Sequence, residues 1–433
     1  MEASTRRSLW RSPRSASTRG MSVPTAPSQE DGVVVIRDLC ITPLGASFMD
    51  GEISVRKFRP RELLIGEVIG RGASSVVRLG EIGGARGASL ADVHSARRLA
   101  VKTFEAPLKA EARSQIYAEC QALAKASSPC IVRLEGAFAS VDGSVSLVLE
   151  LMDRGSLEQL IHGAQAPAAL RHNAVAAPPL GESFMAAVAF QVLWGMAYLH
   201  YERRLHRDIK PANILINSFG EVKLADLGVS RELAPAASMA HTMAGTIRFM
   251  APERLAGGGY GAAADVWSMG VVLLEMASRR KPFNGVQTVM DLHDLLLSPG
   301  AIDAALRHCG ERSAEFREVV RACLEVDPAR RPMTLEDSSS GGSGGSGGPG
   351  CIFDMPWFAN RITRVDLAVD IVRRQLEHHV RPGGSPILSR SNHAVRTGRN
   401  HRPFEDSGVN GGSSGESGGG SFRRRQHGTA EAA

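Results

Sequence analysis

LHRDIKPANILI at 205–216 and EVKLADLG at 221–228 are the stretches that decide the fold. Asp208 and Asn213 lie on one loop between apolar segments, and Asp226 closes the next short strand with a glycine behind it. A soluble domain would seldom place His-Arg-Asp, an Asn five residues on, and Asp-Leu-Gly at this spacing by chance. The two stretches therefore predict a built chemical site.

Phosphoryl transfer requires residues of this kind. The reaction needs little covalent chemistry and much positioning: a carboxylate orients the attacking hydroxyl, and oxygen ligands hold magnesium against the phosphates. We interpret Asp208 as the group that orients a hydroxyl, and Asp226 and Asn213 as the magnesium ligands.

A glycine-rich turn lies further towards the N-terminus. In GRGASSVV, which follows the strand pattern LIGEVI, Gly70 and Gly72 can bring backbone amides against phosphates where a side chain would clash. By itself such a turn is equally typical of a plain hairpin.

The segment LAVK at 99–102 predicts a strand in which Ala100 and Lys102 point to the same side, towards a bound nucleotide. An ammonium that contacts phosphates needs a carboxylate to hold it, and Glu119 lies in the helical pattern IYAECQAL, where one turn of the helix can face Lys102. A surface Lys and a surface Glu are the alternative interpretation of this pair.

Composition excludes several other classes of protein. The chain has 433 residues, enough for roughly two or three domains with a sizeable core. No apolar run approaches the roughly 20 residues of a membrane-spanning helix. The six cysteines lack CxxC or Cys/His spacing, which argues against a zinc site or a disulfide framework and favours a reducing compartment. With 5% aromatic residues and a net charge of +6 carried mostly by the chain ends, a nucleic-acid surface is not indicated.

Shifts in composition divide the chain into five stretches. We expect a disordered basic tail (1–31), an extended lead-in (32–60), a β-rich part (61–152), a mainly helical part (153–380) and a disordered Gly/Ser/Arg-rich tail (381–433). The Ala/Pro-rich residues 162–181 and the Gly/Ser run at 338–350 are predicted surface insertions, because such compositions cannot form a packed core.

Apolar periodicity locates the elements within these parts. Strands are predicted near 61–70, 75–81, 97–104, 131–139 and 145–150, with one helix near 108–126. Further helices are predicted near 156–162, 182–201, 262–278, 286–296, 301–308 and 314–324, and again after 351.

Over roughly residues 61–380 the chain resembles a eukaryotic protein kinase, because that family's motifs occur here in order. The resemblance implies an α+β, bilobal protein kinase fold, with a small β-rich N-lobe carrying one main helix and a larger, mostly helical C-lobe. It also implies ATP and Mg²⁺ as cofactors. Lys210, two residues after Asp208, is the Ser/Thr-type choice, and Thr246 in AGTIRF agrees, since that type of pocket places a hydroxyl near Asp208.

The family's functional residues carry over position by position. The resemblance implies a catalytic set of Asp208, Lys210, Asn213, Lys102 and Glu119, with Asn213 and Asp226 as metal ligands. Contacts to ATP are implied for Ile69, Gly70, Gly72, Val77, Ala100, Lys102, Leu149, Glu150, Leu151, Met152, Leu215 and Asp226, with the hinge at 149–152 and Leu149 as gatekeeper. Structural roles are implied for His206, Arg207, Glu253, Asp265 and Arg331: Glu253 pairs with Arg331, and Asp265 braces the catalytic loop.

Two positions depart from the family pattern. Leu227 stands where a Phe is usual, and Ser75 stands where the third glycine of the loop is usual. Neither change removes a charge or a metal ligand. We expect them to tune the activity and not to abolish it.

A closer resemblance is to the MAP kinase kinases, dual-specificity enzymes that act on the Thr and Tyr of a MAP kinase activation loop. It rests on SPCIVRLEGAF, ELMDRGSLEQLI, GTIRFMAPERL, ASMAHTMAGT and the lead-in GASFMDGEISV. Ser238 and Thr242 occupy the two positions at which an upstream kinase phosphorylates that family. Two phosphates there would add roughly three to four negative charges and could pair with Arg207.

The implied partners are a MAP kinase substrate and an upstream MAP kinase kinase kinase. A docking peptide around Arg6–Trp10 is a loose fit, and RVDLAVDIVRRQL is either a docking segment for the activating kinase or a helix that caps the lobe. No nucleic acid and no membrane span is expected. The cytoplasm is the expected location, with the nucleus as the alternative, and a mitochondrial transit peptide is the second interpretation of the first twenty residues.

Two rival functions stay open. One is a Ser/Thr kinase of another tier, a MAP kinase kinase kinase or a STE20-like kinase, distinguished by whether both Thr and Tyr of a MAP kinase loop are modified. The other is a non-catalytic pseudokinase scaffold, which predicts that Lys102, Asp208 or Asp226 is missing. All three are present.

Overall fold

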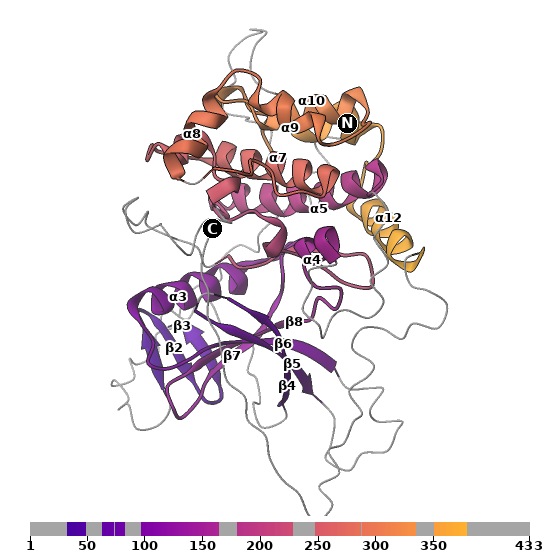
Figure 1. Cartoon of the computed structure of the whole chain (residues 1–433). Helices are drawn as coiled ribbons and strands as arrows, with labels where there is room; N and C mark the ends of the chain where they lie inside the picture. The colour runs from indigo at the N-terminus through magenta and orange to yellow at the C-terminus, as the bar shows by residue number, and fades with distance from the viewer. Residues whose placement is uncertain are drawn as a thin grey trace, which may run out of the picture. The chain divides into compact units, whose positions relative to one another are not determined.

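The computed structural model describes residues 33–48, 63–72, 74–82, 97–163, 180–227, 247–286, 288–334 and 350–378. All of them belong to one unit of the chain, Met1–Ser389. Within it a β-rich N-terminal part precedes a mainly helical C-terminal part (Figure 1).

A five-stranded antiparallel sheet forms the N-terminal part, with strand order β4-β5-β6-β8-β7. Its strands are β4 (Leu63–Arg71), β5 (Val76–Ile82), β6 (Arg97–Phe104), β7 (Leu134–Ala139) and β8 (Val145–Glu150). Side chains alternate between its two faces. Val148 of β8 packs with Leu99 and Val101 in a small cluster on one face, whereas Leu147 and Leu149 join the main core.

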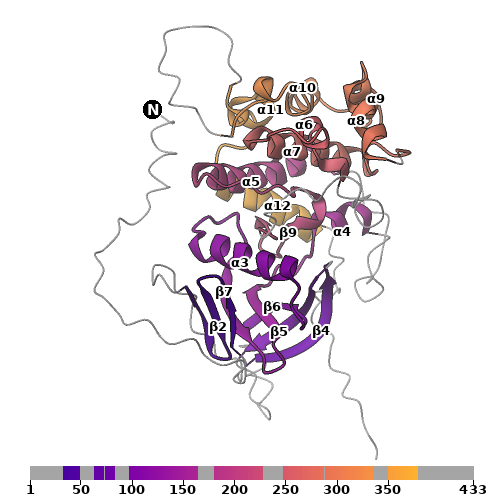
Figure 2. The same ribbon diagram turned by 90° about the vertical axis from the view of Figure 1, so that its left-hand side faces the viewer.

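Helix α3 (Ala110–Lys125) lies between the strands and the helical part (Figure 2). Its buried positions include Ala112, Ile116, Glu119 and Leu123, which recur at three and four and so form one face. That face carries one acidic residue, Glu119, into the interior.

A second sheet precedes the first one in the chain. Strands β1 (Val34–Ile36), β2 (Leu39–Thr42) and β3 (Gly45–Phe48) pair in that order as an antiparallel meander. They pack beside β7 and against α3, whose Tyr117 ring contacts the Phe48 ring edge-on with centroids 6.0 Å apart. The Arg37 guanidinium lies 4.8 Å from the same Tyr117 ring. Part of the lead-in is thus a sheet built onto the main helix of the N-terminal part.

The C-terminal part is built around two buried helices, α5 (Glu182–Tyr201) and α7 (Ala262–Ser278), which pack against each other. Among the described residues, α5 is the one helix long and apolar enough to cross a membrane, and 83% of that window is buried inside the fold, as in a core helix. The remaining elements are α4 (Leu157–His162), β9 (Ile214–Ile216), β10 (Val222–Leu224), α6 (Pro252–Leu255), α8 (Val289–Leu297), α9 (Ala301–Arg307), α10 (Ala314–Cys323), α11 (Pro356–Ala359) and α12 (Val365–His378).

Helix α12 packs along α5 (Figure 1). Its Ala368, Val372 and Leu376 are buried, which is the spacing that predicted a helix here. Gly220, with φ +87°, lies beneath it, and a Cβ at this position would come within 2.2 Å of the Val369 carbonyl oxygen. The segment therefore caps the C-terminal part. A docking role for it stays a prediction.

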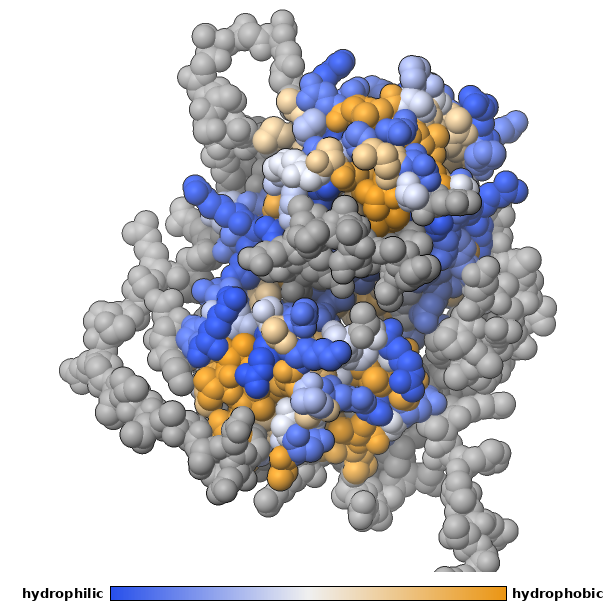
Figure 3. All heavy atoms as spheres, turned by 60° about the vertical axis from the view of Figure 1, so that its left-hand side comes forward, coloured by the Kyte–Doolittle hydropathy of each residue, from blue (hydrophilic) through white to orange (hydrophobic). Residues whose placement is uncertain are grey.

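Large apolar side chains are exposed at scattered positions of the described residues and at Leu64, Ile65 and Val68 along β4. Examples of the scattered positions are Leu44, Val141, Phe219 and Met290. On the face shown in Figure 3, hydrophobic side chains gather in patches, with hydrophilic side chains beside them.

The predicted strands and helices are confirmed, with one informative difference. The strand expected at 131–139 begins only at Leu134. Residues before it pair instead with β10: Val132 N donates to Leu224 O at 2.9 Å, and Leu224 N donates to Cys130 O at 2.9 Å. The ends of the predicted insertion at 162–181 also take part in packing, since His162 closes α4 and Leu180 is buried. Residues 164–179 and 335–349 lie outside the described residues.

Candidate active site

The loop that carries Asp208 lies between α5 and β9. Asp208 Oδ2 accepts from Lys210 Nζ at 2.8 Å and from Asn213 Nδ2 at 2.9 Å. Asn213 Nδ2 also donates to the Asp208 carbonyl at 2.9 Å, and a short 3₁₀ turn at Pro211–Asn213 sets this spacing. Both side-chain contacts from described residues fall on Oδ2, so we expect Asp208 Oδ1 to face the hydroxyl.

Asp265, near the start of α7, fixes the loop from below. Its Oδ2 accepts from His206 N and its Oδ1 from Arg207 N, both at 2.9 Å. Arg207 has φ +69°, an unfavourable region for a residue with a Cβ, so these two bonds hold a strained backbone. His200 also contacts Asp265 Oδ2, at 3.1 Å.

Burial by itself would raise the pKa of the Asp265 carboxyl, but its bonds to His200 and His206 outweigh burial and lower that pKa below the ordinary 3.8. A carboxyl whose pKa is lowered on folding stabilises the protein at any pH above the pKa of the unfolded chain. This stabilisation is lost as the pH falls through the pKa of the folded protein.

Asp265→Asn is therefore expected to lower the free energy of unfolding at pH 7 by about 3 kcal/mol, because the amide has one acceptor oxygen where the carboxylate has two. The difference from the wild type should shrink as the pH is taken below about 4. Urea unfolding of both proteins from pH 7 to pH 3 measures it. A difference that stays constant across this range would contradict the assignment.

The His206 ring links the loop to the strand that carries Asp226. Its Nδ1 accepts from Asp208 N at 3.3 Å, so its Nε2 is the protonated nitrogen and donates to the Ala225 carbonyl at 3.1 Å. Ala225 N donates in turn to the Asn213 carbonyl at 2.9 Å. These bonds fix Asp208, Asn213 and Asp226 relative to one another.

Lys102 of β6 bridges two carboxylates. Its Nζ donates to Glu119 Oε1 and Oε2 at 2.9 and 2.7 Å, and to Asp226 Oδ1 at 2.8 Å. Burial would lower the pKa of Lys102, but the charges of Glu119 and Asp226 outweigh burial and raise it, so the ammonium stays charged. The same ammonium lowers the pKa of Asp226 against the effect of burial. Residues from β6, α3 and the end of β10 thus meet at one point.

The oxygens left over fit a divalent cation. Among the described residues none donates to Asp226 Oδ2 or to Asn213 Oδ1. The described part holds no cluster of three or more His, Cys, Asp or Glu that would bind a metal unaided. Magnesium commonly takes one or two protein oxygens plus substrate phosphates, so this pair of oxygens suits it.

The residues expected to contact a nucleotide lie around this point. At the turn between β4 and β5, Gly72 N donates to Ser75 O at 2.8 Å, and a Cβ on Gly72 would meet Ser75 Oγ at 3.0 Å. Ala100 pairs with Leu149 in the ladder between β6 and β8, and Met152 is buried just beyond β8. The other expected contacts, Ile69, Gly70, Val77, Glu150, Leu151 and Leu215, all lie on β4, β5, β8, β9 or the residue after β8.

The two departures noted in the sequence are accommodated. Leu227 is buried in the main core, where an aliphatic side chain replaces an aromatic one without introducing a polar group. Ser75 is also buried, at the base of the turn.

The buried Arg331 forms an ion pair with the partly exposed Glu253. Arg331 Nη1 lies 2.7 Å from Glu253 Oε1 and Nη2 lies 2.9 Å from Oε2, a two-pronged contact. Arg331 also donates to the carbonyls of Glu325, Val326 and Ala263. This pair anchors α6 to the helical part.

Sequence reasoning missed two groups of contacts. Gln115 of α3 donates to Asp226 and accepts from Ser74, although nothing in its local sequence marks it except its position one helical turn before Glu119. The Glu150 carboxylate accepts from Lys223 Nζ at 2.9 and 3.0 Å, which ties β10 to the end of β8. Some expected residues, namely Ser238, Thr242, Thr246 and those around Arg6–Trp10, lie outside the described residues.

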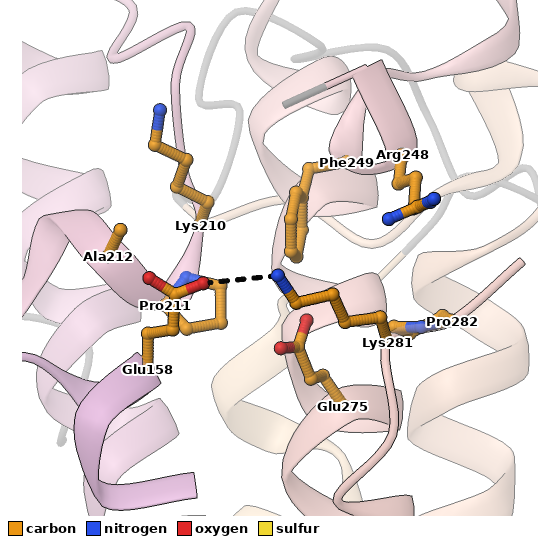
Figure 4. Close-up of a pocket in the computed structure, with 9 residues that line it drawn as sticks. All are labelled: Glu158, Lys210, Pro211, Ala212, Arg248, Phe249, Glu275, Lys281 and Pro282. Carbon is orange, nitrogen blue, oxygen red and sulfur yellow. Dashed lines mark ion pairs between the residues drawn. The ribbon is translucent and has the colours of Figure 1, made fainter. Parts of the chain in front are cut away.

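A pocket of about 200 Å³ opens beside the catalytic loop, between Pro211 and Phe249. In Figure 4, Lys281 reaches across it towards Glu158, and their charged groups are 3.6 Å apart. Glu275 lies at its base, with Oε1 2.6 Å from His162 Nε2 and Oε2 buried without a partner among the described residues. Burial raises the pKa of Glu275. The pocket places an apolar wall and carboxylates next to Lys210.

The sequence profile of the protein kinase domain matches residues 64–338, more than half of the 433 residues. This chain belongs to the protein kinase family. The kinase is 31% identical over 314 residues to mitogen-activated protein kinase kinase 2 of Arabidopsis thaliana, a match that covers 71% of this chain and 78% of the relative.

Two further relatives have similar names. The kinase is 32% identical over 272 residues to mitogen-activated protein kinase kinase SIPKK of Nicotiana tabacum, covering 61% of this chain and 69% of the relative. It is 37% identical over 224 residues to dual specificity mitogen-activated protein kinase kinase 1 of Dictyostelium discoideum, covering 52% of this chain and 30% of the relative. The predicted kinase family and α+β fold are thereby confirmed.

Proposed function

We propose that this kinase is an ATP- and magnesium-dependent MAP kinase kinase that phosphorylates the Thr and Tyr of a MAP kinase activation loop. The observation that carries the proposal is the joint geometry of Lys102, Glu119 and Asp226, set beside Asp208, in a chain similar to three MAP kinase kinases. We propose that the kinase acts in the cytoplasm, with the nucleus as the alternative.

The chain's own residues have separate tasks in the transfer. Asp208 orients the substrate hydroxyl through its open Oδ1, while Lys210 and Asn213 hold its other oxygen. Lys102, kept charged and in place by Glu119, contacts the phosphates of ATP. Asp226 and Asn213 hold magnesium, which when bound neutralises charge on the phosphates.

The pocket beside Lys210 suits the residues that flank the acceptor hydroxyl. Phe249 and Pro211 give it an apolar wall, and Glu158 and Glu275 line it with carboxylates. A substrate segment that lies there brings its hydroxyl towards Asp208.

Activation is proposed to follow phosphorylation of Ser238 and Thr242. Arg207 and Arg254 stack on the Tyr260 ring, 5.5 and 4.8 Å from its centroid, and Arg254 donates to the Arg207 carbonyl at 2.7 Å. Nε of both arginines is buried without a partner among the described residues. Two guanidinium groups that each keep a donor without a partner among the described residues support an anionic partner here, and phosphates on the activation segment have that chemistry.

The test uses the protein with Ser238→Asp and Thr242→Asp, incubated with ATP, magnesium and a panel of catalytically inactive MAP kinases. Mass spectrometry is expected to find phosphate on both the Thr and the Tyr of one activation loop. Ser230→Asp, a serine of the same segment, serves as the matched control and should not activate. Asp208→Asn should abolish the signal.

Other outcomes point to the rival functions. Phosphate only on generic Ser/Thr substrates would assign the kinase to another tier, and no transfer at all would favour a scaffold. With Ser238→Ala and Thr242→Ala, we expect the response to an upstream MAP kinase kinase kinase to disappear.

A further inference from the structure

Gln115 occupies an unexpected position for a partly exposed polar residue of α3. Its Oε1 accepts from Ser74 Oγ at 2.8 Å, and its Nε2 donates to Asp226 Oδ1 at 3.3 Å. Ser74 belongs to the turn between β4 and β5, in which Gly72 N bonds to Ser75 O. One amide therefore touches both the glycine-rich turn and the carboxylate at the end of β10.

The helix geometry makes this contact specific. Gln115 and Glu119 are four residues apart, so they lie on the same face of α3 one turn from each other. Glu119 reaches Asp226 through Lys102, and Gln115 reaches it directly. Both contacts with Asp226 fall on Oδ1, which leaves Oδ2 free for a metal ion.

Chemistry fixes the orientation of the amide. The Asp226 carboxylate only accepts, so the Gln115 nitrogen must face it and the Gln115 oxygen must face Ser74. The hydroxyl of Ser74 is then the donor. The contact with Ser74 is the shorter of the two, 2.8 Å against 3.3 Å, and the contact with Asp226 has a charged acceptor, so both fix the position of the amide.

We propose that Gln115 is a positioning residue that couples closure of the glycine-rich turn to the metal-ready orientation of Asp226; this rests on the proposed function. When Gln115 holds Ser74, the turn is kept close to the bound phosphates while Asp226 is held with Oδ2 directed to the metal ion. Movement of α3 would release both contacts together with the Lys102–Glu119 pair. Gln115 thus links the position of the turn to the positions of α3 and of Asp226.

The alternative is that Gln115 is a helix surface residue whose two bonds add only local stability. That alternative predicts a change in unfolding and none in nucleotide binding. The two arms can also be separated, because Ser74 is exposed and its hydroxyl can be removed without disturbing the core.

The experiment measures dissociation constants of the full chain for ATP by titration calorimetry, with magnesium and with EDTA. Gln115→Met, which keeps the shape and removes both polar atoms, should weaken binding of ATP with magnesium about tenfold and binding in EDTA much less. Ser74→Ala should weaken binding a few-fold. The double variant should be no worse than Gln115→Met alone, because both substitutions break one linkage.

Gln121→Met on the same helix is the matched control, since Gln121 contacts Tyr117 and Arg204 and lies away from the site. It should leave both dissociation constants unchanged. Additive effects of Ser74→Ala and Gln115→Met, or equal losses with and without magnesium, would overturn the coupling. Should Gln115→Met fold poorly, an unchanged dissociation constant in Ser74→Ala overturns it as well. A wild-type chain that binds no ATP with magnesium would instead overturn the proposed function.

Discussion

Asp226→Asn is expected to lower the rate of phosphoryl transfer by on the order of 10³-fold. The substitution keeps the size of the side chain and removes its charge. The proposed metal site then loses its only carboxylate, and Lys102 loses one of the two carboxylates that hold it. Incorporation of labelled phosphate into a protein substrate, measured at saturating ATP and magnesium, gives the rate.

Asp142→Asn is the matched control for this substitution. Asp142 accepts through a single oxygen, Oδ1, from the backbone and the hydroxyl of Ser144, in the turn before β8. An Asn there keeps that acceptor, so its activity should stay near the wild-type value. If Asp226→Asn kept more than a tenth of the activity, Asp226 could not be the essential metal ligand.

Arg331→Leu is expected to lower the free energy of unfolding by roughly 3–5 kcal/mol. Arg331 is 1% exposed and supplies the donors for the Glu253 carboxylate and three backbone carbonyls. Its guanidinium also lies 4.9 Å from the Trp267 ring. A leucine fills much of the space but leaves three carbonyls and the mostly covered Glu253 carboxylate without these donors, which is the costly part of the change.

Urea unfolding, followed by tryptophan fluorescence, measures the loss. Arg321→Leu is the control, because Arg321 pairs with Asp303 at 2.9 Å on the surface, where both side chains are about half exposed. It should change the free energy of unfolding by at most about 1 kcal/mol. Equal losses of unfolding free energy in the two variants would show that the contacts of the buried Arg331 stabilise the fold no more than a surface ion pair does.

The core of the site could be predicted because its residues are close in sequence. Asp208, Asn213 and Asp226 lie within nineteen consecutive residues, 208–226, and the motif they form constrains its own geometry. Lys102 and Glu119 come from elements whose apolar spacing is clear, so their meeting follows from a helix laid on a sheet. Local chemistry and simple periodicity were sufficient for these positions.

Gln115 could not be predicted in the same way. A polar residue at a partly exposed helical position is typical of any surface helix, and its partners are 41 residues before it and 111 residues after it. Only the packing of α3 between the two segments brings the three groups together. Its functional meaning therefore depends on tertiary structure alone.

The late start of β7, at Leu134, has a similar cause. Apolar residues recur from Ile131 to Ala139 with only Arg133 and Glu135 charged between them, so a single strand was the natural interpretation. In the fold the first residues bond to β10 of the helical part, and β7 begins at Leu134. Apolar periodicity indicates that a segment is extended and buried, but it does not indicate the strand with which the segment pairs.

The sheet β1–β3 and the helix α12 have a practical consequence for anyone who trims the protein. The kinase domain profile ends at residues 64 and 338, yet Leu39, Ile41 and Phe48 before it and Ala368 and Val372 after it are buried in the same core. Cutting at the profile's ends would expose the faces of α3 and α5 that these segments cover and invite aggregation. The smallest piece that keeps its apolar faces covered runs from about residue 33 to about residue 378.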